Sequence, residues 1–159
     1  MKRTLHLAFA ALLCLLPILT GCKTTDHAET GQLASLEISG RSEADILRAV
    51  KAVFIANGYK HTKDLTFEKR GSSWDTAAYG GWSSAVWIRL KATVDPTPTG
   101  QYVIGCDAYT VDNHDQGVME MEQKRAYAKR DECAKLLEQV KAKLDSPGPI
   151  PDVPDADQP

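Results

Sequence analysis

The chain has 159 residues, and its 21 acidic residues nearly balance its 19 lysines and arginines, for a formal net charge of −2. This length fits one domain with a modest core. The basic residues are scattered among acidic ones, so the charge pattern does not favour nucleic acid, and we expect no nucleic-acid partner.

The first 21 residues have the three-part organisation of a secretory signal. Two basic residues stand at positions 2 and 3, residues 7–19 run without a charge, and the small pair Thr20-Gly21 follows. A membrane-spanning helix needs about 20 apolar residues, whereas this run is shorter and contains Pro17. The pattern therefore predicts a signal that is cleaved.

The signal ends with the residues Leu19, Thr20, Gly21 and Cys22. They resemble the lipobox of bacterial lipoproteins, in which a leucine, two small residues and the modified cysteine stand in this order. The resemblance implies cleavage before Cys22, a diacylglycerol on its sulfur and, in many bacteria, a third acyl chain on its new amino group. Two or three acyl chains anchor a protein durably to membrane lipid, whereas one anchors it marginally.

The residue after the lipobox cysteine is Lys23 and not an aspartate. By similarity to the sorting rule of enteric bacteria, this favours the outer membrane of the cell envelope over the inner membrane. The covalent lipid on Cys22 is the only cofactor that we expect.

Composition divides the rest of the chain into three regions after the signal, residues 1–21. Residues 22–32 comprise the lipid-bearing cysteine and a small polar linker, which as a flexible coil spans roughly 15 to 20 Å. Residues 33–145 form one compact domain. Residues 146–159 contain five prolines and three aspartates, and they predict a disordered, extended tail.

The first half of the domain predicts a strand, a helix and a second strand. Leu36 and Ile38 alternate with polar residues before the turn at Gly40. Ser42 is a good N-cap for a helix over 43–57, which carries apolar residues at helical spacing and ends at an Asn-Gly pair. A further strand lies within 59–69.

A β-hairpin is the strongest signal in the domain. Residues 85–94 alternate between apolar and polar side chains, so one face of this strand belongs to the core. A turn rich in Pro, Thr and Gly over 95–100 leads into a second strand over 101–111.

A long helix over about 118–144 is predicted to complete the domain. Apolar residues from Tyr127 to Leu144 lie along one side of it. The pairs Glu120/Lys124 and Asp131/Lys135 lie on its solvated faces. The order β-α-β-β-β-α predicts an α+β fold, an antiparallel sheet with two helices packed on one face.

Two cysteines, Cys106 and Cys133, are left in the domain of an exported protein. A strand-to-helix disulfide between them would close a loop of about 28 residues and contribute roughly 3.5 kcal/mol by the loop-entropy model. The alternative is a pair of buried free thiols that act as small hydrophobic side chains.

The sheet face that the helices leave open is a candidate binding surface, because it presents Trp87, Arg89, Lys91 and Tyr109. Exposed aromatic and arginine side chains are enriched at interaction sites. The alternative is that the segment around residues 71–82, or a second copy of the sheet, covers this face.

That segment has the most unusual composition in the domain, with Trp74, Tyr79, Trp82 and three glycines within twelve residues. Glycines allow close backbone approach and aromatic rings supply flat contact area, so the segment is a candidate loop for a ligand or partner. Alternatively, the three aromatic residues fold back onto the sheet as a plug.

The sequence contains no recognisable catalytic motif. Ser72, Ser73 and Asp75 with His61 or His114 can be drawn as a hydrolytic set, but neighbouring positions in a chain do not supply triad geometry. Residues 112–115 (Asp-Asn-His-Asp) carry side chains suited to a hard cation, yet turn and capping roles explain them better. We expect no metal site.

We therefore expect a membrane-anchored envelope lipoprotein whose domain is a non-enzymatic binding module for an envelope protein or a cell-wall ligand. One alternative is an inhibitor or accessory subunit of a secreted enzyme, with the aromatic loop placed in the cleft of its partner. The other is a hydrolase with an unrecognised site. Fold alone does not decide among these classes, because function depends on the site.

Overall fold

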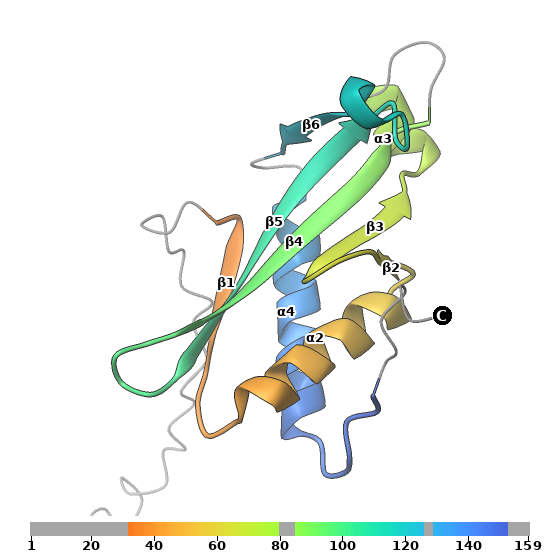
Figure 1. Cartoon of the computed structure of the whole chain (residues 1–159). Helices are drawn as coiled ribbons and strands as arrows, with labels where there is room; N and C mark the ends of the chain where they lie inside the picture. Colours follow the sequence, from red (N-terminus) through yellow and green to blue (C-terminus); the bar gives the residue numbers. More distant parts are fainter. Residues whose placement is uncertain (1–31, 80–84, 126–128, 153–159) are drawn as a thin grey trace, which may run out of the picture.

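The structure is a computed structural model and describes residues 32–79, 85–125 and 129–152. Its centre is an open antiparallel sheet in the order β1-β5-β4-β3-β2, with β6 paired to β5 (Figure 1). The strands are β1 (Ala34–Ile38), β2 (Lys60–His61), β3 (Thr66–Arg70), β4 (Trp87–Pro96), β5 (Tyr102–Asp112) and β6 (Met121–Lys124). The helices are α2 (Glu43–Ala56), α3 (Ser73–Tyr79), the 3-10 helix η1 (Gly117–Met119) and α4 (Arg130–Asp145).

The predicted α+β architecture is confirmed. Helices α2 and α4 pack against each other and cover the same face of the sheet (Figure 1). Ser42 caps α2, because its hydroxyl oxygen accepts a hydrogen bond from the Asp45 backbone N–H at 3.2 Å. The helix ends at Asn57, and Gly58 follows with φ +83°, a conformation that favours glycine.

The core lies between this helix pair and the covered face of the sheet. Alternation along β4 places Ile88 and Leu90 in the core, where both are fully buried. Phe54 of α2 and Phe67 of β3 meet there with ring centroids 4.6 Å apart. Burial of such side chains is the main favourable contribution to folding.

The hairpin of β4 and β5 forms as predicted. The two strands pair without interruption from Trp87 opposite Val111 to Pro96 opposite Tyr102. Gly100 has φ +77° in the turn, and the Thr97 backbone N–H donates to the Gln101 carbonyl at 2.8 Å. This hairpin carries Arg89 and Lys91 of the candidate site.

The prediction of one long helix over 118–144 is wrong in its first half. In the described chain, η1 and strand β6 occupy 117–124, and α4 begins only at Arg130. The expected Glu120/Lys124 helix pair is absent: Glu120 pairs with Arg89 at 2.7 Å, and Lys124 with Asp107 at 3.0 Å. Sheet pairing and these ion pairs outweigh the helix propensity of the segment. The predicted apolar position 127 lies outside the described residues.

The prediction of an irregular loop after β3 is also wrong in part, because residues 73–79 form α3. Ser72 and Asp75 make a reciprocal cap at its start: the Asp75 N–H donates to the Ser72 hydroxyl at 3.2 Å, and the Ser72 N–H to the Asp75 carboxylate at 2.8 Å. The same carboxylate pairs with Lys129 at 2.7 Å, just before α4. This ion pair joins α3 to the start of α4.

The chain enters the domain across the open face of the sheet. The side chain of Gln32 lies over Gly105 of β5, where a Cβ atom would meet it at 2.1 Å. Its amide donates to the Thr93 hydroxyl at 2.7 Å, and the Leu33 N–H donates to the Asp107 carboxylate at 3.0 Å. Gln32, the last residue of the linker, is therefore fixed to the hairpin.

The described part of the predicted tail is in contact with the domain. Ile150 packs partly buried against the core, and Asp152 lies 3.5 Å from Arg48 of α2. The predicted signal, the lipobox at 19–22, most of the linker and residues 153–159 lie outside the described residues. No helix within the described ranges is long and apolar enough to cross a membrane.

Candidate binding site on the open sheet face

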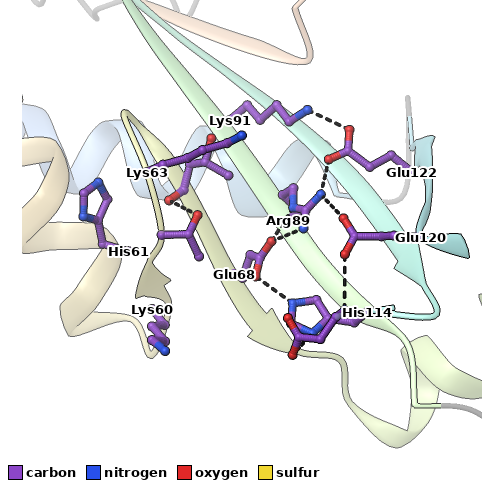
Figure 2. A pocket seen from close by; sticks show the side chains of 12 residues that line it. Lys60, His61, Lys63, Glu68, Arg89, Lys91, His114, Glu120 and Glu122 are labelled. Atoms are coloured by element: carbon purple, nitrogen blue, oxygen red, sulfur yellow. Dashed lines mark hydrogen bonds and ion pairs between the residues drawn. The ribbon is translucent and has the colours of Figure 1, made fainter. Parts of the chain in front are cut away.

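Arg89 is the centre of an ionic cluster on the open face (Figure 2). Its guanidinium contacts the carboxylates of Glu68, Glu120 and Glu122, at 2.7 Å in the case of Glu120. The Arg89 side chain is only 15% exposed and that of Glu68 only 7%. A guanidinium has five N–H donors, which suits it to hold several carboxylates at once.

Strand register explains how the cluster forms. Glu68 of β3 lies directly opposite Arg89 of β4, so the two side chains share the open face. On the far side of β5, strand β6 places Glu122 opposite Val111. Lys91 extends the cluster by pairing with Glu122 at 2.7 Å. Ion pairs thereby join β3, β4 and β6 with the turn before β6.

His114 covers the upper part of this face. Its ring stacks on Trp87, with centroids 4.0 Å apart and planes 10° apart. Its Nε2 lies 2.7 Å from Glu68 Oε2, and its Nδ1 lies 2.9 Å from Asp115. Asn113 and Asp115 adopt positive φ, of 53° and 65°, as polar turn residues do. Residues 112–115 thus form a turn, and this turn places His114 back over the sheet.

The cluster changes the protonation behaviour of its members. The hydrogen bond from Arg89 lowers the pKa of Glu120. Burial raises the pKa of Glu122, but hydrogen bonds from Lys91 and Arg89 outweigh burial and bring it below its usual range. Burial also opposes the charge of Arg89, yet its hydrogen bonds to glutamates raise its pKa overall. All three groups are therefore charged at neutral pH.

A pocket of about 470 Å³ opens beside the cluster. Figure 2 shows Glu120 and Glu122 on one side of Arg89, and Lys60 and Lys63 on the other side, beyond Glu68. Lys60 and Lys63 are exposed, and neither ammonium group forms an ion pair with a described residue. The lining residues are Lys60, His61, Thr62, Lys63, Thr66, Glu68, Arg89, Lys91, His114, Asp115, Glu120 and Glu122.

The aromatic residues expected to act together are separated in the structure. Trp87 lies beneath His114, and the Tyr109 ring lies 4.6 Å from the Lys91 ammonium. Tyr79 packs partly buried against the core under Arg125, at 4.6 Å. Trp74 is 82% exposed. Tyr79 therefore follows the expectation of an inward-folded aromatic residue and Trp74 does not, while Trp82 lies outside the described residues.

Cys106 and Cys133 meet in the core as the sequence predicts. Both are fully buried, and their sulfur atoms are 2.7 Å apart as free thiols. Burial, followed by the neighbouring Cys133 thiol, raises the pKa of Cys106 well above its usual value. The two side chains are positioned to form the predicted disulfide, which stays a prediction.

The residues of the imagined hydrolytic set do not come together. The Ser72 hydroxyl caps α3 with Asp75, His61 Nε2 lies 2.6 Å from the Asp64 carbonyl, and His114 is held by Glu68. Among the described residues, no group of three or more His, Cys, Asp or Glu side chains is arranged to hold a metal ion. Within the described ranges, the open face presents charged side chains and a pocket.

The sequence pattern points to Arg89 and its aromatic neighbours but not to their partners. Glu68, His114, Glu120 and Glu122 are not among the residues predicted for the binding surface, although Glu68 follows from the strand pattern once β3 is placed beside β4. The other three lie in a segment that was interpreted as a turn and a helix.

Comparison with known proteins assigns the chain to no family: neither the protein-family models nor the curated proteins contain a match to it.

Proposed function

We propose that this chain is a lipid-anchored protein of the bacterial envelope, held in the outer membrane, and that its domain is a non-enzymatic module that binds an anionic ligand in the open-face pocket. The anchor rests on the lipobox at Leu19-Thr20-Gly21-Cys22. The proposal of an anionic ligand rests on the charged side chains that line the pocket. The ligand belongs to another envelope component, a protein or a cell-wall fragment.

Two unpaired cations carry the proposal for the ligand. The Arg89 charge is matched by three glutamates, whereas Lys60 and Lys63 face the same pocket with no ion-pair partner in the described chain. A carboxylate or phosphate group that binds on the side of the pocket lined by these lysines would gain attraction without displacing an existing pair. Glu120 and Glu122 on the opposite side repel a second negative charge, so the pocket favours an anionic end of a larger ligand.

The anchor is tested by intact-mass analysis of protein purified from membranes. The expected product begins at Cys22 and carries acyl chains. An unmodified full-length chain in membranes would contradict the anchor.

Binding is tested by NMR titration of the mature chain with acetate and, separately, with inorganic phosphate. Saturable shifts at Lys60, Lys63 and Lys91 with one anion identify its chemical class. The shifts should vanish in a Lys60→Ala/Lys63→Ala variant and persist in Lys135→Ala/Lys143→Ala, which removes two lysines from α4. Equal weak shifts in both variants would show that the pocket does not select anions.

A further inference from the structure

Three large hydrophobic side chains are exposed at one end of the domain. Trp74 is 82% exposed, Met119 65% and Met121 53%, and they belong to α3, η1 and β6 respectively. A small domain usually buries such side chains, so a group of them at one place indicates a contact surface. We call these three residues the apolar tip.

Strand register shows that the three segments share one end of the sheet. Strand β3 ends where Arg70 pairs with Trp87, and α3 follows it. Strand β5 ends where Asp112 pairs with Met121, and η1 lies in the connection between them. Figure 1 shows α3 and β6 gathered at this end of the hairpin. Ion pairing of Asp75 with Lys129 and the contact of Tyr79 with Arg125 join α3 to the chain that follows β6.

The linker is long enough to bring the apolar tip to a membrane that holds Cys22. Ten residue steps lead from Cys22 to Gln32, and fully extended they span at most about 35 Å. The linker ends near the pair Ala34 and Cys106. Cys106 lies six residues along β5 from Asp112, or about 20 Å at the usual rise of a strand. The tip therefore lies within the reach of the anchor.

We propose that the apolar tip inserts into the interfacial layer of the membrane to which the chain is anchored. This inference rests on the lipid anchor of the proposed function and adds an orientation to it. Trp is suited to the boundary between lipid and water, because its ring is apolar and its N–H is polar. Exposed apolar side chains at one end of the domain fit a fluid lipid layer without a complementary partner surface.

The opposite end of the hairpin has different chemistry. Its turn reads Asp-Pro-Thr-Pro-Thr-Gly over 95–100, and Thr99 is exposed. The linker also reaches this end, but the turn offers no large apolar side chain to lipid. Composition, and not reach alone, selects the apolar tip as the end that contacts the membrane.

The test uses the full mature chain, acylated at Cys22 and reconstituted in vesicles of phosphatidylethanolamine and phosphatidylglycerol. An environment-sensitive fluorophore is attached at Met119→Cys in one sample and at Thr99→Cys in another. Cys106 and Cys133 are fully buried, so the introduced thiol is the one that reacts among the described residues. Quenchers fixed to the lipid chains then report how deeply each position lies.

The expected result is quenching several-fold stronger at position 119 than at position 99. Adding Trp74→Ser and Met121→Ser should reduce the quenching at 119 several-fold, and raising the salt concentration should leave it unchanged, because apolar burial dominates. Confirmation of acylation by mass in the same sample separates this test from that of the anchor.

Equal quenching at the two positions on an acylated chain would overturn the orientation and leave the anchor standing. Failure of acylation would overturn both. Shielding at position 119 that occurs only in native membranes, together with a protein crosslinked at that position, would overturn the lipid contact in favour of a protein partner. That outcome would support the alternative role as an inhibitor or accessory subunit.

Discussion

The two faces of strand β4 are stabilised by different interactions. On the covered face, Ile88 and Leu90 are fully buried among apolar side chains from α2 and α4. On the open face, Arg89 and Lys91 form ion pairs with glutamates that stand about thirty positions later in the chain. The covered face depends on apolar burial, whereas the structure of the open face depends on charge.

We therefore expect the two faces to contribute differently: the covered face to the stability of the whole domain, and the open face to the local order of the turn and β6. Apolar burial should set the free energy of unfolding of the whole domain. The ionic cluster should chiefly hold the turn and β6 against the sheet, because Glu120 and Glu122 belong to that segment. Four predictions test this division, beginning with the largest expected effect.

Replacing Phe67 by alanine on the covered face should have the largest effect. Its ring is fully buried against Phe54, and removing it leaves a cavity that costs about 3 to 5 kcal/mol of unfolding free energy. Urea unfolding of the variant measures this loss. Trp74→Ala is the matched control, because that ring is 82% exposed and its loss should change stability by under about 0.5 kcal/mol. Equal losses of unfolding free energy in the two variants would contradict the assignment of Phe67 to the core.

Oxidation of Cys106 and Cys133 should stabilise the covered face further, by roughly 3.5 kcal/mol in the loop-entropy model. Each thiol gives up one electron and one proton to an oxidising disulfide, which is reduced to two thiols. Burial raises the pKa of Cys106 and disfavours its reactive thiolate, so we expect oxidation before the core closes. Non-reducing peptide mapping of protein from the envelope should find the linked pair; two free thiols there would refute the prediction.

Arg89→Met should have a smaller effect, a loss of about 2 kcal/mol, because it leaves the buried carboxylate of Glu68 without the hydrogen bond that Arg89 donates. Hydrogen exchange should rise most across 120–124 and stay nearly unchanged in α2. The control Lys91→Met removes a side chain that is 40% exposed and should cost under about 0.5 kcal/mol. A uniform rise in exchange throughout the domain would contradict a local role for the cluster.

Acid should weaken the open face first. The folded-state pKa values of Glu120 and Glu122 lie below the ordinary value of 4.5, so the folded protein binds fewer protons than the unfolded chain as the pH falls past that value. Their stabilising contribution is complete above about pH 4.5 and is lost as the pH falls through the lowered pKa values. Glu120→Gln/Glu122→Gln should reduce the slope of stability against pH below 4.5. An unchanged slope would assign acid sensitivity to other carboxylates.

The parts of the fold predicted correctly are those encoded by local pattern. The alternation of Val86, Ile88 and Leu90 identified a half-buried strand, and Ser42 with Asn57-Gly58 marked both ends of α2. These signals depend on neighbours in sequence, which the chain itself displays. The α+β class and the two helices on one face followed from them.

The parts predicted wrongly are those decided by distant partners. Residues 118–129 favour a helix locally, but the pairing of Glu120 and Glu122 with Arg89 draws the first half of this stretch onto the edge of β5. Sequence pattern shows neither the register of an added edge strand nor which cation a glutamate will meet. For the same reason Arg89 was identified as a site residue without its glutamates.

The position of Gln32 over Gly105 also determines how the domain bears mechanical load. Tension from the proposed membrane anchor would enter at the start of β1, which pairs through residues 34–38 with the part of β5 next to the turn. A pull along this strand loads its interstrand hydrogen bonds together as shear instead of opening them one at a time. If the pocket binds a component of the envelope, force between that component and the lipid anchor would pass through β1, the strand next to the linker.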